Sequence, residues 1–264
     1  MRGYDQRGRC KRQALTLSSQ LHSLISTGFL AVAIMIPGAP DCSICVHIDD
    51  QLSLSSFDNP RIILSYINRE DALPLFDQHE INNLWLPLQK LALRRLLSVP
   101  HDAAEYDKNQ QDILFKGWSS RALPKHWHFA SEDGDDMMRS VKILGEGSFG
   151  LVEEVVLDTQ PEPIVCVRKR FVRPHRLNGQ QKLFEAFRRE INVMRQVSHR
   201  HCVEIVGSYT DYDSVAMLSS PVADMDLAAF LDRSELSPAQ LSTLRQGIGC
   251  LCGALAYLHG KHIR

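Results

Sequence analysis

The chain has 264 residues, and 44 % of them are hydrophobic, which is enough to bury the core of one or two domains. The 30 Lys and Arg residues almost balance the 31 Asp and Glu residues, and the formal net charge is −1. Such a charge gives no sign of a nucleic-acid-binding surface, so we expect no nucleic-acid partner. The 7 scattered cysteines are odd in number, which suits a reducing compartment better than a disulfide framework.

Residues 1–70 are predicted to be a poorly defined N-terminal segment. The longest apolar run, residues 24–36, is too short for a membrane span, although the basic residues before it faintly resemble a secretory signal. We favour a buried or poorly ordered segment over a signal or anchor, and we expect no membrane partner. Cys42 and Cys45 form a C-x-x-C pair beside His47, but a closed zinc site needs four ligands, so no metal site is predicted.

Residues 71–137 are predicted to be a helical extension. Leucines and other apolar residues recur at helical spacing between Asp71 and Lys116, and Pro87 is expected to start a second helix. Such a segment can dock on a neighbouring lobe or bind a regulator, and the pattern leaves both roles open. A helical extension without a special role is the favoured interpretation.

The most informative motif is G-x-G-x-x-G, with the three glycines at positions 145, 147 and 150. Glycines at this spacing let a turn bring its backbone N–H groups close to phosphate oxygens. A dinucleotide-binding βαβ unit uses the same spacing, but there the glycines open a helix. Here residues 140–144 and 151–157 flank the turn, and the second run is rich in β-branched residues, which predicts a strand–turn–strand flap over a nucleotide. The alternative is a glycine-rich hairpin without a ligand. The residues predicted to bind the cofactor at this flap are Leu144, Gly145, Glu146, Gly147, Ser148, Phe149, Gly150 and Val152.

A lysine downstream of the flap is a candidate for contact with the same phosphates. Residues 165–171 alternate apolar and polar side chains like a strand with one buried face, and Lys169 shares the face of Val167. We therefore choose Lys169 over Arg168 as the cation that reaches the phosphates. Arg168 and Arg170 point the other way and are expected to be solvated.

A carboxylate on a predicted helix can hold this lysine in place. The apolar spacing predicts a helix over residues 180–197, with Glu190 at the edge of its apolar stripe and Glu185 on the solvated face. At an effective dielectric constant near 20, a pair of unit charges 4 Å apart attracts by roughly 4 kcal/mol before desolvation is counted. Glu190 is therefore predicted to pair with Lys169.

Together, the glycine loop, the strand lysine and the helix glutamate resemble the N-terminal lobe of a eukaryotic protein kinase. The resemblance covers residues 138–264 and implies an α+β fold: an antiparallel sheet with one regulatory helix, followed by the first helices of the C-terminal lobe. It places a hinge that binds adenine at residues 219–223, and the gatekeeper before it is Leu218 or Ser219. The positions expected to contact adenine and ribose are Val167, Ser219, Ser220, Val222 and Asp226.

Two further segments extend the resemblance. Residues 198–203 stand where kinases often carry H-P-N-I-V, and we interpret the two histidines there as structural. Ser237 and Pro238 predict the start of a long helix with a capping box, and Gly260 predicts its end. In detail the sequence is similar to filamentous-fungal Ser/Thr kinase-like proteins.

The resemblance implies transfer of the γ-phosphoryl group of ATP to Ser or Thr hydroxyls of proteins, inside the cell in the cytoplasm or nucleus. In this role Lys169 holds the α- and β-phosphates, Glu190 positions Lys169, and ATP with Mg²⁺ is the cofactor. The motifs H-R-D, D-F-G and A-P-E do not occur in the sequence. The metal ligands are therefore expected beyond Arg264, and the chain by itself is expected to be inactive. The alternative is a pseudokinase-like or truncated module that binds nucleotide or a partner without catalysis.

Overall fold

The computed structural model describes residues 58–114, 126–130, 137–147, 150–158, 162–233 and 235–263. These residues divide into two compact units. The larger unit holds the described residues up to Asn192 together with Ile205–Val222, and the smaller one holds Val193–Glu204 and residues 223–263. The predictions on the apolar run, the C-x-x-C pair, Ser148 and Phe149 lie outside the described residues.

In the described part of the chain, six strands form one sheet in the order β1-β5-β6-β4-β3-β2. Their bounds are β1 Trp127–His128, β2 Met138–Gly147, β3 Gly150–Leu157, β4 Ile164–Val172, β5 Glu204–Thr210 and β6 Ser214–Ser220. The pairs β2–β3, β3–β4 and β4–β6 are antiparallel, whereas β1 runs parallel to β5. The strand predicted on each side of the glycine turn is present, and the α+β fold class is confirmed.

The apolar core of the sheet includes residues that precede position 138. Trp127 and Phe129 are buried in one cluster with residues of β2, β3, β4, β5 and β6. Gly207 on β5 makes room for the indole, because a Cβ at this position would lie 2.7 Å from a ring atom of Trp127. The short strand β1 therefore belongs to the packing of the sheet, although it lies outside the part of the chain that resembles a kinase.

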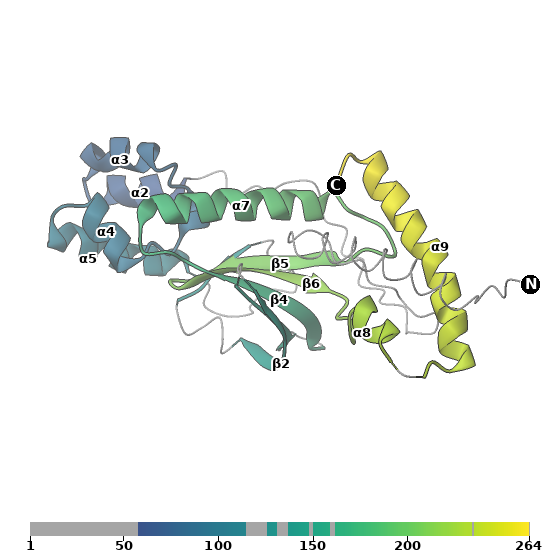
Figure 1. Cartoon of the computed structure of the whole chain (residues 1–264). Helices are drawn as coiled ribbons and strands as arrows, with labels where there is room; N and C mark the ends of the chain where they lie inside the picture. Colours follow the sequence, from purple (N-terminus) through teal and green to yellow (C-terminus); the bar gives the residue numbers. More distant parts are fainter. Residues whose placement is uncertain are drawn as a thin grey trace, which may run out of the picture. The chain divides into compact units, whose positions relative to one another are not determined.

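Four described α-helices precede the sheet (Figure 1): α2 Asn59–Tyr66, α3 Leu73–Gln78, α4 Lys90–Leu96 and α5 Pro100–Gln110. Short 3-10 helices join them: η1 Glu70–Ala72, η2 Asn83–Trp85 and η3 Gln111–Ile113. We call residues 59–114 the helical extension. It begins at Asn59, ahead of the predicted boundary at residue 71, since Pro60 occupies the first turn of α2, where proline is well tolerated.

The prediction that Pro87 starts a helix was wrong. Leu86 is extended, and Gln89, the residue before α4, is extended as well. The carbonyl oxygens of Leu86 and Pro87 accept hydrogen bonds from the Thr210 hydroxyl and the Arg173 guanidinium, respectively. Side chains of the sheet thus bind carbonyls that a helix would direct along its own axis.

Three further helices follow β4: α7 Leu177–Arg195, α8 Leu227–Leu231 and α9 Pro238–Gly260. Helix α7 runs along the sheet (Figure 1) and buries Phe184, Phe187 and Ile191, which confirms the predicted apolar stripe. Helix α9 begins with the predicted capping box, in which Ser237 and Gln240 exchange hydrogen bonds between side chain and backbone.

Within the smaller unit, α9 packs through its last turns. Ala254 and Leu258 are buried against Val197 and Cys202, and the backbone N–H of Ser198 donates to the Tyr257 hydroxyl at 2.9 Å. None of the described helices is both long and apolar enough to cross a membrane.

Candidate functional site

The glycine flap is the hairpin of β2 and β3, whose register runs from Met138 opposite Leu157 to Gly147 opposite Gly150. Gly150 has φ +123°, and a Cβ there would lie 1.9 Å from the Arg170 carbonyl oxygen. Gly150 is therefore required by the close approach of β4. A Cβ at Gly145 would meet no atom within 4 Å, so the space beside this backbone is open. Gly145 and Gly150, two of the three glycines of the motif, therefore serve different physical purposes.

The predicted ion pair between β4 and α7 is present. Lys169 Nζ lies 2.7 Å from Glu190 Oε1, and the two side chains are 21 % and 16 % exposed. The Lys169 amine also lies 5.1 Å from the ring centroid of Phe171, and that ring packs edge-on against Phe187 of α7. The amine is thus held by contacts with its own strand and with the helix, while water still reaches it.

The strand register decides which residues share a face of the sheet with Lys169. Val152 on β3 and Met217 on β6 are directly opposite Lys169, and Ser219 is opposite Val167. Directly opposed residues project to the same face of a sheet. Four of the predicted cofactor-binding residues, Val152, Val167, Lys169 and Ser219, therefore lie on one face, and each of them is half-buried.

The same register resolves the two candidates for the gatekeeper. Leu218 is opposite Arg168, fully buried, and belongs to the core cluster on the other face of the sheet. Ser219 shares the face of Lys169. The structure therefore places Ser219, and not Leu218, beside the candidate site.

The prediction that Arg168 is solvated was wrong. Its side chain is 2 % exposed, and its Nε and Nη2 donate to Glu153 Oε2 at 3.1 and 2.9 Å. Arg170, which we also expected to be solvated, is only 26 % exposed and lies 3.5 Å from the same carboxylate. The Ser140 hydroxyl donates to Glu153 at 2.9 Å, so side chains of three residues bind this buried carboxylate. Alternation along β4 suggested one buried face, but both faces are packed: Cys166, on the face of Arg168, belongs to the core cluster, and Phe171, on the face of Lys169, packs against Phe187 of α7. Glu185, predicted to be solvated, is exposed.

The buried pair could have been found from the hairpin pattern. Once the two strands are aligned, Glu153 stands directly opposite Arg168, and opposite charges at one register position attract.

The neighbouring Cys166 is fully buried, and burial raises the pKa of its thiol to about 12. This thiol is therefore protonated and unreactive at neutral pH.

The predicted hinge and ribose positions are distributed over the two units. Ser219 and Ser220 end β6 and, like Val222, are half-buried in the larger unit. Asp226 belongs to the smaller unit, where its exposed carboxylate caps α8 by accepting from the Ala229 N–H at 2.7 Å. Its contact with ribose remains a prediction.

The two histidines of residues 198–203 are packed as a structural interpretation requires. His199 stacks on Tyr257 with ring centroids 5.0 Å apart, and the His201 ring lies 5.5 Å from that of His199. In the described ranges, no three His, Cys, Asp or Glu residues are grouped so that they could hold a metal ion.

Comparison with protein families gives a match that coincides with the segment carrying the flap, the lysine and the glutamate. The model of the protein kinase domain matches residues 138–264. The comparison with curated proteins gave no match. Protein kinases transfer phosphoryl groups and use ATP with Mg²⁺. Residues 138–264 of this chain therefore belong to the protein kinase domain family.

Proposed function

We propose that this chain provides the ATP-binding part of a protein kinase that phosphorylates Ser and Thr hydroxyls of intracellular proteins. The observation that carries the proposal is the 2.7 Å pair of Lys169 and Glu190, with Lys169 on the strand that pairs with the glycine hairpin. A lysine on the strand after a glycine loop, paired with a helix glutamate, is the arrangement that protein kinases use for the phosphates of ATP.

The residues of the site fit a nucleoside triphosphate. The backbone at Gly145 borders open space, which a side chain at that position would occupy. Val152 and Val167 are only partly buried, so they offer apolar surface to a base on the face that carries Lys169. The site thus combines an apolar surface with a cation, as adenine and phosphate groups require.

In this proposal each side chain has a separate task. The Lys169 ammonium neutralises the oxygens of the α- and β-phosphates, and Glu190 fixes the position of that ammonium. The backbone of the flap covers the phosphates, and the end of β6 near Ser219 contacts adenine. Bound ATP with Mg²⁺ supplies the phosphoryl group, and the chain contributes positioning and charge.

The first test separates phosphate binding from base binding. Calorimetric titration of the full chain should show that Lys169→Met weakens ATP affinity by at least about tenfold, because the cation facing the phosphates is lost. Adenosine has no phosphates, and its affinity should change by less than about twofold. Lys182→Met removes a surface lysine of α7 and serves as the matched control, with no change expected for either ligand.

A wild-type chain that binds neither ATP nor adenosine would refute the proposal. If ATP binds, mass spectrometry of peptides incubated with chain, ATP and Mg²⁺ tests the transfer step. Phosphate on Ser or Thr supports the enzyme. Phosphate on Tyr corrects the substrate class, and tight binding without transfer agrees with a chain that provides only the ATP-binding part.

A further inference from the structure

The helical extension contacts the kinase-like sheet through residues 85–89, which run from the last residue of η2 to the residue before α4. Its members from Trp85 to Gln89 are all buried. The backbone N–H of Leu88 is bound by Gln110 Oε1 at 2.8 Å, and Gln89 Nε2 donates to the Tyr212 carbonyl in the turn between β5 and β6 at 2.7 Å. This segment thus joins the extension's own helices to the sheet.

The same segment holds the N-terminal half of α7. The Trp85 indole packs on the Phe184 ring with centroids 5.0 Å apart, and both side chains are almost completely buried. One turn earlier, Gln180 Nε2 donates to Gln89 Oε1 at 2.7 Å, and Gln180 is fully buried. An aromatic contact and a buried hydrogen bond therefore fix two successive turns of α7 to the extension.

Arg173, just after β4, binds both the extension and α7. Its guanidinium donates to the carbonyls of Trp85 and Pro87 at 2.9 and 2.8 Å and to Gln180 Oε1 at 3.0 Å. The side chain is buried, and this burial lowers its pKa to about 10, against the opposing effect of Asp211 and Asp213. The two terminal nitrogens of this buried guanidinium therefore bind the extension and α7 to one cation, whereas its Nε has no hydrogen-bond partner among the described residues.

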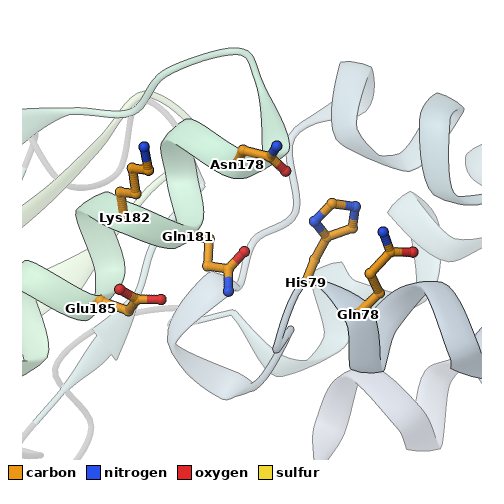
Figure 2. A pocket seen from close by; sticks show the side chains of 6 residues that line it. All are labelled: Gln78, His79, Asn178, Gln181, Lys182 and Glu185. Carbon is orange, nitrogen blue, oxygen red and sulfur yellow. The ribbon is translucent and has the colours of Figure 1, made fainter.

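The rim of this contact is open and polar, as Figure 2 shows. A cavity of about 310 Å³ separates Gln78 and His79 of the extension from Asn178, Gln181, Lys182 and Glu185 of α7. His79 and Gln181 face each other across it (Figure 2). The rim offers no apolar anchor, so the hold on α7 comes from Trp85, Gln89 and Arg173.

Glu190 lies on the continuation of the same helix. It lies six positions after Phe184, which is about 9 Å along an α-helix. Between them Phe187 packs on Phe171 of β4, two residues from Lys169. A shift or rotation of the first turns of α7 would therefore displace the carboxylate that holds the lysine.

We propose that the helical extension is a positioning element for the kinase-like site, and that Trp85 acts on Lys169 through α7 and Glu190. The inference rests on the proposed nucleotide site, and it adds a task for residues that lie before the part of the chain matched by the kinase family. Trp85 touches no nucleotide in this proposal. It is a positioning residue whose effect passes through Glu190.

The first experiment follows α7 without any ligand. Hydrogen–deuterium exchange of the full chain is compared between the wild type, Trp85→Ala and the control Leu157→Ala, which removes a fully buried side chain of the sheet core. We expect Trp85→Ala to accelerate exchange over residues 187–191 by about tenfold or more relative to the control, because the turns before them lose their anchor. Equal exchange in the two variants would overturn the proposal.

The second experiment measures coupling. Trp85→Ala should weaken the affinity for ATP about fivefold and leave the affinity for adenosine unchanged. In a Glu190→Gln background, the same substitution should weaken the affinity for ATP by less than about a further twofold, since residues acting through one contact are not additive. Trp85→Phe should restore most of the ATP affinity. Full additivity with Glu190→Gln, or equal losses for ATP and adenosine, would show a merely structural role.

These experiments distinguish failure of the proposed ATP site from failure of the positioning role of the extension. If the wild type does not bind ATP, the proposed function fails, and the exchange experiment still decides whether the extension positions α7. If Trp85→Ala does not fold, Gln180→Met takes its place, because it removes the hydrogen bonds to Gln89 and Arg173 while keeping the volume. For Gln180→Met, faster exchange at residues 187–191 supports the proposal, and unchanged exchange overturns it.

Discussion

The two faces of β4 carry two ion pairs that begin one residue apart in the sequence. On one face, Arg168 and Glu153 are 2 % and 6 % exposed and are surrounded by hydrogen-bonding partners within the core. On the other face, Lys169 and Glu190 are 21 % and 16 % exposed and join the sheet to a helix. A fully enclosed pair fixes structure, whereas a pair that water and a ligand can reach is able to take part in chemistry.

The two pairs differ in how much lost hydration their binding partners must replace. Two charges taken out of water lose several kcal/mol of hydration each, and only close partners can restore it. The first pair has such partners in Arg170, Ser140 and Tyr209. The second keeps part of its hydration, so it can be rearranged when a phosphate arrives.

The largest effect is expected from opening the buried pair. Arg168→Met leaves the Glu153 carboxylate in the core with weaker compensation, and we expect the free energy of unfolding to fall by about 3 kcal/mol. Urea denaturation followed by circular dichroism measures this change. The double variant Arg168→Met with Glu153→Met removes both charges and should recover at least half of the loss. If Arg168→Met were as stable as the wild type, the claim that the buried pair stabilises the fold would be wrong.

The half-buried imidazole of His128 extends the comparison to a group that is held neutral. Burial lowers the pKa of His128 to about 4, and its Nδ1 lies 2.9 Å from the Leu86 carbonyl oxygen. The unfolded chain takes up this proton near pH 6.5, so it binds more protons than the folded state between pH 6.5 and 4. Stability from this group is therefore complete above pH 6.5 and declines as the pH falls, by about 3 kcal/mol at pH 4.

His128→Asn tests this dependence, because the amide can still donate to Leu86 but does not titrate in this range. Unfolding free energies measured at pH 7 and pH 4.5 should differ less in His128→Asn than in the wild type. The same pH dependence in both proteins would assign the acid sensitivity to other groups.

The smallest effect on stability is expected at the accessible pair. Glu190→Gln should change the free energy of unfolding by less than about 1 kcal/mol, since partly exposed ion pairs contribute little. The same variant should lower ATP affinity, because Lys169 loses the partner that positions it. Denaturation and calorimetric titration of one preparation measure both. A stability loss as large as that of Arg168→Met would show that the two pairs have the same role.

Much of the candidate site could be predicted because its signals are local. The glycine spacing and the β-branched run predicted the hairpin, and the apolar period of the helix placed Glu190 beside its stripe. The capping box at Ser237 also fixes a helix start from neighbouring residues alone. Lys169 was chosen by strand alternation, which assigns side chains to faces.

Alternation failed at Arg168, because it cannot show that both faces of a strand are covered. It also left Leu218 and Ser219 as equal candidates, and only the register with β4 separated them. The tolerance of proline in the first turn of a helix predicts a helix start at Pro87, but Arg173, which is distant in sequence, binds its carbonyl. In each case the deciding contact joins residues far apart in the chain.

Local patterns along the chain were enough to predict which short segments form the flap, the lysine strand and the glutamate helix, because turn chemistry and hydrophobic period act over a few residues. Contacts between distant segments establish which charge is buried, which residue lies beside the lysine and what holds α7 in place. These depend on strand register and on the packing of Trp85 against Phe184, interactions that arise only when distant parts of the chain meet.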